Sequence, residues 1–408
     1  MAGRSRSGTE CEITVEKLDE VKTYQDKHPY ADPGNHDREH FKKRMGPLRF
    51  KMREYLTKYT ENQSEMLFQW QSKFSSKFLD QYFAYTALMG SHMFYVVMVP
   101  MPRWLGYSDV CRDLVYILGY SIYLSGFLKD YWCLPRPKSP PLTRVTLSGY
   151  TTKEYGAPSS HTANATGVTM LLLWYIYSSE TMPLHWKLAA TAGAFFYYFT
   201  LTLGRIYCGM HGLLDIFSGA LIGAVCFVGR WATLSYTDFD AASMEVWGWW
   251  FPFGSVALGL TLLFTHARPV DHCPCFEDSV AFVGVICGLE SSDWLSWSLF
   301  GKSNYQVYYD WSEFGLIFTL RRIVVGVALV LIWKSVVGKK LLYTLLNFVW
   351  ADDRHLYAHG HDETSYLKEV LPFIGRSRTE LLCRFILYAG VAAVVVLICP
   401  TAFLWLGV

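Results

Sequence analysis

Three short segments of this 408-residue chain combine residue types that bind and attack phosphate. The first runs from a lysine to an Arg-Pro pair, the second is Pro-Ser-Ser-His, and the third joins an arginine to a histidine and an aspartate. The planar fork of arginine binds phosphate oxygens in pairs, and lysine adds a point charge. We therefore predict a phosphate-binding group made of Lys129, Arg136, Ser159, Ser160 and Arg205.

His211, Asp215 and His161 supply the groups that could carry out the reaction. His211 and Asp215 are four residues apart, so on a helix they share one face. The carboxylate can accept one imidazole N–H, which leaves the other nitrogen as a nucleophile. His161 can act as a general acid, and it lies at a predicted helix start, where free N–H groups bind anions. These three residues are the predicted catalytic set.

Each segment also has a purely structural interpretation. The cations could anchor a span at the membrane interface, the serines could only cap a helix, and the His211–Asp215 pair could join buried helices. All three segments offer groups suited to phosphate, which favours a catalytic site over the structural interpretations. Two apolar spans separate the second segment from the third, so the chain returns to the same side of the membrane.

Membrane-spanning helices are the elements predicted to position these segments. Hydrophobic residues make up 51% of the chain and charged residues only 18%, below the quarter or so that is usual in soluble proteins. The apolar segments are Tyr82–Pro100, Leu114–Leu128, Thr162–Tyr177, Leu188–Leu203, Leu213–Val228, Trp247–Phe264, Val280–Leu289, Ile323–Val337 and Phe385–Leu406. Some are short, and Val280–Leu289 could be re-entrant, so we expect about eight spans.

The predicted fold class is therefore all-α, in a polytopic membrane protein. We divide the chain into a basic soluble tail (1–80), a catalytic membrane core (81–265) and additional transmembrane helices with a polar loop (266–408). The net charge of +2 gives no reason to expect a nucleic-acid partner. The expected partners are a lipid phosphate and the bilayer, and a homodimer is left open.

The tail contains a basic segment, His40–Lys58, with the periodicity of an amphipathic helix. Its apolar residues Leu48, Met52, Tyr55, Leu56 and Tyr59 fall on one helical face with basic flanks. This pattern suits an anionic membrane surface. Packing of the helix on the protein body is the alternative.

Two other groups of side chains could bind a metal. His272, Cys273 and Cys275 are close in sequence, but zinc sites usually have four ligands at recognised spacings. His355, His359, His361 and Asp362 lie in a polar stretch that fits no such spacing, and we predict a solvated connector there. We expect neither a metal nor another cofactor.

The motifs Lys-x6-Arg-Pro, Pro-Ser-x-His and Arg-x5-His-x3-Asp resemble the signatures of the type 2 phosphatidic acid phosphatase (PAP2) superfamily. The sequence around these motifs is similar to that of the fungal long-chain base 1-phosphate phosphatases. The resemblance implies a six-helix core and a metal-independent phosphatase of the endoplasmic reticulum that acts on dihydrosphingosine and phytosphingosine 1-phosphates. It further implies that His211 forms a phosphohistidine, that Asp215 orients it, and that His161 protonates the leaving alkoxide.

Two positions depart from the usual superfamily motifs. Ser160 stands where glycine is usual, and Gly204 stands where serine is usual. We expect Ser160 to narrow the phosphate pocket or to add a hydrogen bond there, and Gly204 to remove one hydroxyl from it.

The basic tail and the family resemblance give conflicting indications of how the protein is oriented in the membrane. The basic tail indicates a cytosolic N-terminus, and two spans before Lys129 would place the motifs on that same face. The resemblance implies a lumen-facing site, which we adopt. Asn164 begins an N-glycosylation sequon beside His161, and we expect it to stay unmodified. Glycosylation of Asn62 would show that the tail lies in the lumen. A broader lipid phosphate phosphatase or phosphotransferase, and a non-catalytic lipid-phosphate transporter, are the alternative functions.

Overall fold

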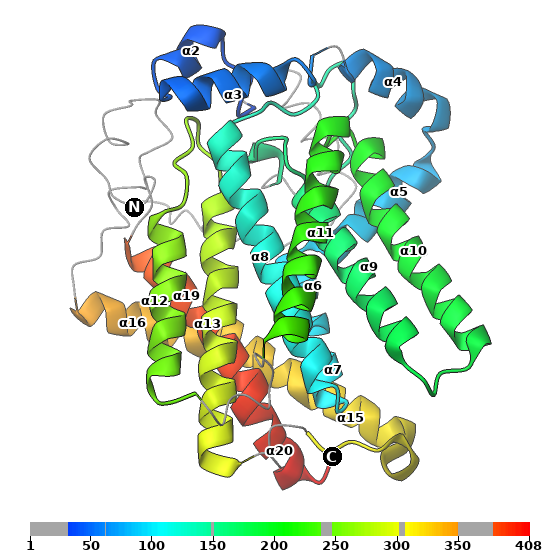
Figure 1. The fold of residues 1–408 in the computed structure, drawn as a ribbon, viewed down its shortest axis with the longest axis vertical. Helices are drawn as coiled ribbons and strands as arrows, with labels where there is room; N and C mark the ends of the chain where they lie inside the picture. The colour runs from blue at the N-terminus through cyan, green and yellow to red at the C-terminus, as the bar shows by residue number, and fades with distance from the viewer. Residues whose placement is uncertain (1–31, 62, 148–150, 238–246, 302–306, 350–377) are drawn as a thin grey trace, which may run out of the picture.

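The computed structural model describes residues 32–61, 63–147, 151–237, 247–301, 307–349 and 378–408, and all regular structure within these ranges is helical. Figure 1 shows long helices lying side by side, with short N-terminal helices across one end of them. The all-α prediction is therefore confirmed. The 355–362 histidine group and Asn62 lie outside the described residues.

The helices across that end are α2 (Arg38–Lys42), α3 (Pro47–Thr57) and α4 (Gln63–Phe74). The helix predicted within His40–Lys58 is present as α3, which begins at Pro47, because proline lacks an N–H and suits the first turn of a helix. The start of the segment lies on the separate helix α2. Phe50 and Arg53 face the protein body and are buried. The predicted apolar face, with Leu48 74% and Tyr55 57% exposed, points away from it.

Next come α5 (Lys77–Thr86), η1 (Ala87–Gly90), α6 (His92–Met98), α7 (Met101–Trp104) and the long α8 (Ser108–Trp132). The three segments predicted to be catalytic lie at the end of α8 and the loop after it, and on α9 (Ser160–Ser178), α10 (Leu184–Tyr207), α11 (Leu213–Tyr236) and the loops that join them. The C-terminal part holds α12 (Trp250–Phe264), α13 (Cys275–Phe300), α15 (Trp311–Ile332), η4 (Trp333–Val337), α16 (Gly338–Val349), α19 (Arg378–Ala393), η6 (Val394–Ile398) and α20 (Cys399–Leu406).

By length and apolar composition, three continuous helical stretches in the described part of the chain are able to cross a membrane. They are Leu213–Tyr236, Trp311–Phe348 and Thr379–Leu406. The first predicted span is instead a bent pair, Lys77–Gly90 and His92–Trp104, which meet at 61°. The number of about eight spans stays a prediction. Val280–Leu289 lies within α13, so its interpretation as a re-entrant piece is wrong.

Buried ion pairs explain why α8 and α13 are long but not uniformly apolar. Asp113 on α8 pairs with Arg230 at 2.7 Å, and Asp293 on α13 pairs with Arg103 at 2.9 Å. Charged residues inside a membrane bundle pair with one another rather than face lipid. Such pairs lower the hydropathy of a helix without exposing charge.

Glycines allow the helices of the site to approach one another closely. A Cβ at Gly223 of α11 would lie 2.2 Å from the carbonyl oxygen of Ala163, and one at Gly219 would lie 2.4 Å from that of Ser159. Small residues at such crossings let two backbones touch. The contact fixes the start of α9, with its serines and His161, against the start of α11.

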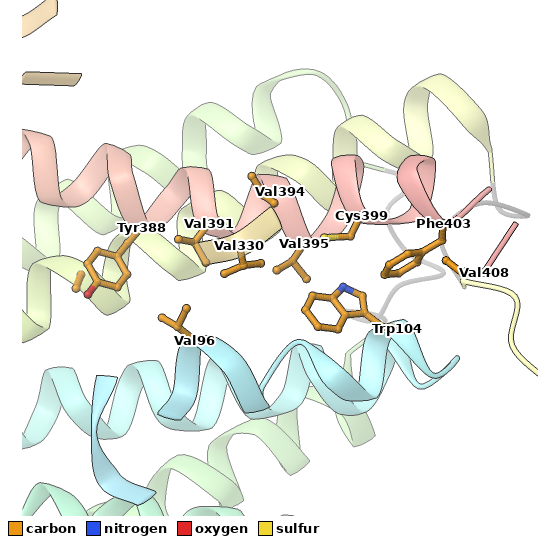
Figure 2. Close-up of a cluster of buried hydrophobic side chains, with 11 residues drawn as sticks. Val96, Trp104, Val330, Tyr388, Val391, Val394, Val395, Cys399, Phe403 and Val408 are labelled. Atoms are coloured by element: carbon orange, nitrogen blue, oxygen red, sulfur yellow. The ribbon is translucent and has the colours of Figure 1, made fainter. Parts of the chain in front are cut away.

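A separate apolar cluster joins the α6–α7 segment to the C-terminal helices. In Figure 2, Val96 and Trp104 of the α6–α7 segment face Val391, Val395 and Phe403 of the C-terminal helices. The C-terminal helices therefore pack against the helices that lead into the catalytic core.

Candidate active site

The structure brings the predicted site residues together at one end of the bundle. Lys129 comes from the last turn of α8 and Arg136 from the loop that follows. Ser159, Ser160 and His161 form the start of α9, Arg205 ends α10, and Asp215 begins α11. Residues 129–215 thus converge as the sequence predicted.

His211 and Asp215 form the predicted pair. The Nδ1 atom of His211 lies 3.2 Å from Oδ2 of Asp215, and the Gly212 N–H donates to the same oxygen at 2.9 Å. Asp215 is completely buried. With Nδ1 donating to the carboxylate, the lone pair on Nε2 is available for attack.

Arg136 lies next to that attacking nitrogen. Its NH1 atom is 3.3 Å from His211 Nε2, and its other nitrogens donate to the carbonyl oxygens of Glu154 at 2.8 Å and Thr151 at 2.9 Å. Three backbone contacts, including one to Met210, hold the guanidinium in place. The positive charge is therefore fixed beside Nε2 of His211, where it can attract an anion.

Burial and the nearby cations favour the neutral form of His211. Burial lowers the pKa of His211 well below its usual value, and Arg136, Lys129 and Arg205 lower it further. Arg205 is 4% exposed and its Nε has no hydrogen-bond partner. A buried guanidinium N–H without a partner is costly, so the site is suited to an anionic ligand that accepts from it.

The two serines have different surroundings. Ser159 caps α9, because its hydroxyl accepts from the Thr162 N–H at 3.3 Å. Its own N–H donates to the Asp215 carbonyl at 2.9 Å, which joins α9 to α11. Ser160 Oγ lies 3.4 Å from the Lys129 ammonium, which donates to it. The side chain that replaces the usual glycine therefore faces the phosphate-binding lysine.

Gly204 packs against an aromatic ring. A Cβ at this position would lie 2.9 Å from Cδ1 of Phe83 on α5. Glycine here accommodates that ring, and the expected loss of one hydroxyl from the phosphate pocket stays a prediction.

Glu154 is a site residue that the sequence did not reveal. Its carboxylate contacts the Lys129 ammonium and lies 3.7 Å from NH2 of Arg136. It is 7% exposed and belongs to the long loop between the first two motifs. No spacing rule connects it to a motif; its only signal was an acidic residue in the loop that joins the first two motifs.

The N-terminal helices also contact the catalytic loops. Gln63 of α4 accepts from the Leu213 N–H at 3.2 Å, close to the His211–Asp215 pair. Gln71 donates to the carbonyl oxygens of Thr143 and Tyr207, both at 2.7 Å. Helix α4 and the candidate site therefore lie on the same face of the molecule.

The group of potential metal ligands around Cys273 and Cys275 differs from the predicted one in one residue. Cys273 and Cys275 are buried and gather with Asp130, and their potential ligand atoms lie within 4.8 Å of one another. His272 is exposed and is not part of the group. Asn164 is buried and donates to the Tyr95 hydroxyl at 3.0 Å, which fits the expectation that it stays unmodified.

Comparison with known proteins decides the family. A PAP2 superfamily domain matches residues 111–238. The dihydrosphingosine 1-phosphate phosphatase YSR3 of Saccharomyces cerevisiae is 53% identical over 93% of each chain. This chain belongs to the PAP2 superfamily.

More distant relatives cover most of this PAP2 chain as well. A dihydrosphingosine 1-phosphate phosphatase of Schizosaccharomyces pombe is 34% identical over 73% of the chain and 71% of its own length. The lipid phosphate phosphatase delta of Arabidopsis thaliana is 28% identical over 80% of the chain and 82% of its own length. No solved structure matches. The matched domain holds every predicted site residue, and α12 to α20 lie beyond it.

Proposed function

We propose that this PAP2 enzyme hydrolyses sphingoid base 1-phosphates and that His211 is its nucleophile. The observation that carries the assignment is the buried His211–Asp215 pair, whose attacking nitrogen lies beside Arg136. Lys129 and Arg205 complete a group of cations that can neutralise the phosphate oxygens. The names of the two fungal relatives support the substrate class.

The reaction proceeds in two displacements. Nε2 of His211 forms a bond to phosphorus while the bond from phosphorus to the C1 oxygen of the lipid breaks. His161 gives its proton to that oxygen, and the free base leaves. His161 then takes a proton from water, whose oxygen displaces His211 and releases phosphate. The cations stabilise the charge that spreads over the equatorial oxygens in both steps.

Phosphate release by purified protein in detergent with EDTA tests this proposal. We expect release from dihydrosphingosine and phytosphingosine 1-phosphates, inhibition by vanadate, and a loss of about 10⁴-fold or more in His211→Ala. His185→Ala, an exposed histidine on α10, is the matched control and should keep full activity. Full activity in His211→Ala would overturn the assignment of the nucleophile.

A broader lipid phosphate phosphatase is the second candidate, favoured by the similarity to the Arabidopsis relative. Equal turnover of phosphatidic acid in the same assay would establish it. A non-catalytic transporter is less well supported, because a binder needs the cations but not His161 together with the His211–Asp215 pair. The proposal also places the enzyme in the endoplasmic reticulum membrane with its site facing the lumen.

A further inference from the structure

The first predicted span is broken where it passes the candidate active site. Helix α5 ends at Thr86, the turn η1 follows, and α6 begins anew after Ser91, whose hydroxyl accepts from the Phe94 N–H at 3.2 Å. The two halves of the span meet at 61°. A break within a span is tolerated where its backbone is buried in protein or lines a site. At this break, η1 contacts one of the predicted catalytic residues.

Gly90, the last residue of η1, lies against the ring of His161. A Cβ at position 90 would lie 2.2 Å from Cδ2 of the imidazole and 2.5 Å from its Nε2. Both distances are far below ordinary van der Waals contact, so a methyl group there would displace the ring. Glycine is therefore what lets the backbone of the broken span reach the edge of the imidazole.

The same turn contacts the ring through its backbone. Ala87, the C-cap of α5, forms a backbone hydrogen bond with His161. Carbonyl oxygens at the end of a helix lack an N–H partner within that helix and accept from nearby side chains. A carbonyl oxygen accepts only from a ring nitrogen that carries a proton, so this contact favours the protonated imidazole.

The contact with Ala87 opposes the other influences on His161. Burial lowers the pKa of His161 well below its usual value, and Arg205, Lys129 and Arg136 lower it further. The backbone hydrogen bond with Ala87 raises this pKa. A phosphate bound among the three cations would offset their charge, so that the ring could hold the proton that a general acid donates.

A second contact joins α6 to α9 one turn further along. The Tyr95 hydroxyl accepts from Nδ2 of Asn164 at 3.0 Å, and both side chains are buried. Asn164 follows His161 by three residues, so the bond fixes α6 against the first turn of the helix that carries the imidazole. On the other side of the break, Phe83 of α5 packs against Gly204 near the end of α10. The broken span thus contacts α9 and α10 at their catalytic ends.

We propose that Gly90 and Tyr95 are positioning residues for the general acid. Gly90 leaves room for the His161 ring beside η1, and Tyr95 holds the first turn of α9. The inference rests on the proposed function, in which His161 protonates the oxygen of the leaving alkoxide. Both residues lie outside the three motifs and before the PAP2 domain match at residues 111–238. The broken span therefore contributes to the site from outside the matched domain.

Two substrates that differ in their leaving group test this role. The alkoxide of dihydrosphingosine 1-phosphate needs a proton to leave, whereas the nitrophenolate of an alkylated nitrophenyl phosphate does not. Because kcat/KM reports the steps up to loss of the leaving group, it separates the action of the acid from the later hydrolysis of the phosphohistidine. His161→Ala is the reference variant. It should lower kcat/KM about 100-fold or more for the lipid and only about twofold for the nitrophenyl ester.

Gly90→Ala should show the same selectivity, because the added methyl group displaces the ring. We expect kcat/KM to fall about 10–100-fold for the lipid and about twofold or less for the nitrophenyl ester. In a His161→Ala background, where the ring is absent, Gly90→Ala should cause no further loss. Gly193→Ala on α10, where a Cβ meets nothing within 4 Å, is the matched control and should change neither substrate. Equal losses on both substrates, or losses that add fully in the double variant, would overturn the role of Gly90.

Tyr95→Phe decides the case in which Gly90→Ala does not fold, because it removes only a hydroxyl. We expect kcat/KM for the lipid to fall about 2–10-fold, as is typical for the loss of one hydrogen bond, with no change for the nitrophenyl ester. Tyr236→Phe, 78% exposed on α11, is its control and should alter neither substrate. Unchanged lipid turnover in Tyr95→Phe, or a loss shared by both substrates, would overturn the positioning role.

The reference variant separates this inference from the proposed function. Equal losses on both substrates in His161→Ala would refute His161 as the general acid. Absence of phosphate release from both substrates by the unmodified enzyme would refute the proposed function itself. A selective loss in His161→Ala without one in either Gly90→Ala or Tyr95→Phe would refute only the positioning role.

Discussion

Arg136 lies beside His211, the proposed nucleophile, and its charge affects the expected pH dependence of the reaction. His211 reacts only when neutral, and the nearby cations help to hold its pKa well below the usual value. The enzyme should therefore keep its activity as the pH falls below neutrality. Removing one of these cations should raise the pKa of His211 and narrow the pH range over which the enzyme is active.

We predict that Arg136→Gln shifts the acidic limb of the kcat/KM profile to higher pH, in addition to a loss of about 100-fold or more at neutral pH. The profile of phosphate release against pH measures both effects. Lys138→Gln, an exposed cation two residues away, should leave the limb unchanged. An unshifted limb in Arg136→Gln would show that Arg136 does not act on His211.

Glu154 competes with phosphate for Lys129 and Arg136, because its carboxylate contacts the first and approaches the second. We predict that Glu154→Gln binds vanadate about tenfold more tightly, a change of about 1.4 kcal/mol. The same change leaves the buried cations less well compensated, so thermal stability should fall. Glu180→Gln, an exposed control, should change neither inhibition nor stability. Weaker vanadate binding in Glu154→Gln would contradict the prediction.

The sequence revealed those site residues whose spacing carries the chemistry. His211 and Asp215 are four residues apart, although His211 lies in the loop before α11 and not on the helix. The arginines and the lysine stand at fixed distances from a proline or a histidine. Glu154 and Gln63 belong to the same site but reach it only through the folded path of a loop and of α4. A contact made by tertiary folding leaves no periodicity in the sequence from which it could be predicted.

At the scale of elements, α4 stabilises the loops that carry the catalytic residues. Gln71 donates to Thr143 and Tyr207, and its Oε1 accepts from the Thr143 N–H at 2.9 Å. We predict that Gln71→Ala leaves buried backbone groups unpaired and costs about 1–3 kcal/mol. A lower midpoint of thermal unfolding, with faster proteolysis after Lys138, would show this. Gln69→Ala, exposed on the same helix, should not alter either measurement.

Helix positions were predictable where apolar residues run continuously, as in α9 to α11. The starts of helices were less predictable. In the sequence, Arg112 and Asp113 look like the end of a polar loop, but α8 begins before them at Ser108. Both are buried, and Asp113 pairs with Arg230 of α11. A charge neutralised by a partner far away in sequence cannot be distinguished from a solvated one until the fold is known.

At the scale of the whole molecule, the structure relates the tail to the catalytic loops. Asp80 on α5 accepts from the Tyr207 hydroxyl near the site, whereas Trp104 packs against Phe403 on α20. The bent pair from Lys77 to Trp104 thus leads away from the site, and α8 returns over about 38 Å at 1.5 Å per residue. We therefore expect the described part of the tail and the site to face the same side of the membrane.

Single cysteines in a Cys11→Ser background test this arrangement, because the described native cysteines are all buried. We expect a membrane-impermeant maleimide, added to sealed microsomes, to label Lys58→Cys in the tail and Lys138→Cys in the loop after α8 to the same extent. Tyr107→Cys, 63% exposed at the far end of α8, should react from the opposite side. Protection of the first two until the membrane is permeabilised would make the site lumenal, despite the basic tail. Opposite accessibility of Lys58→Cys and Lys138→Cys would refute the shared face, since the contacts of Gln63 and Gln71 could not form across a bilayer.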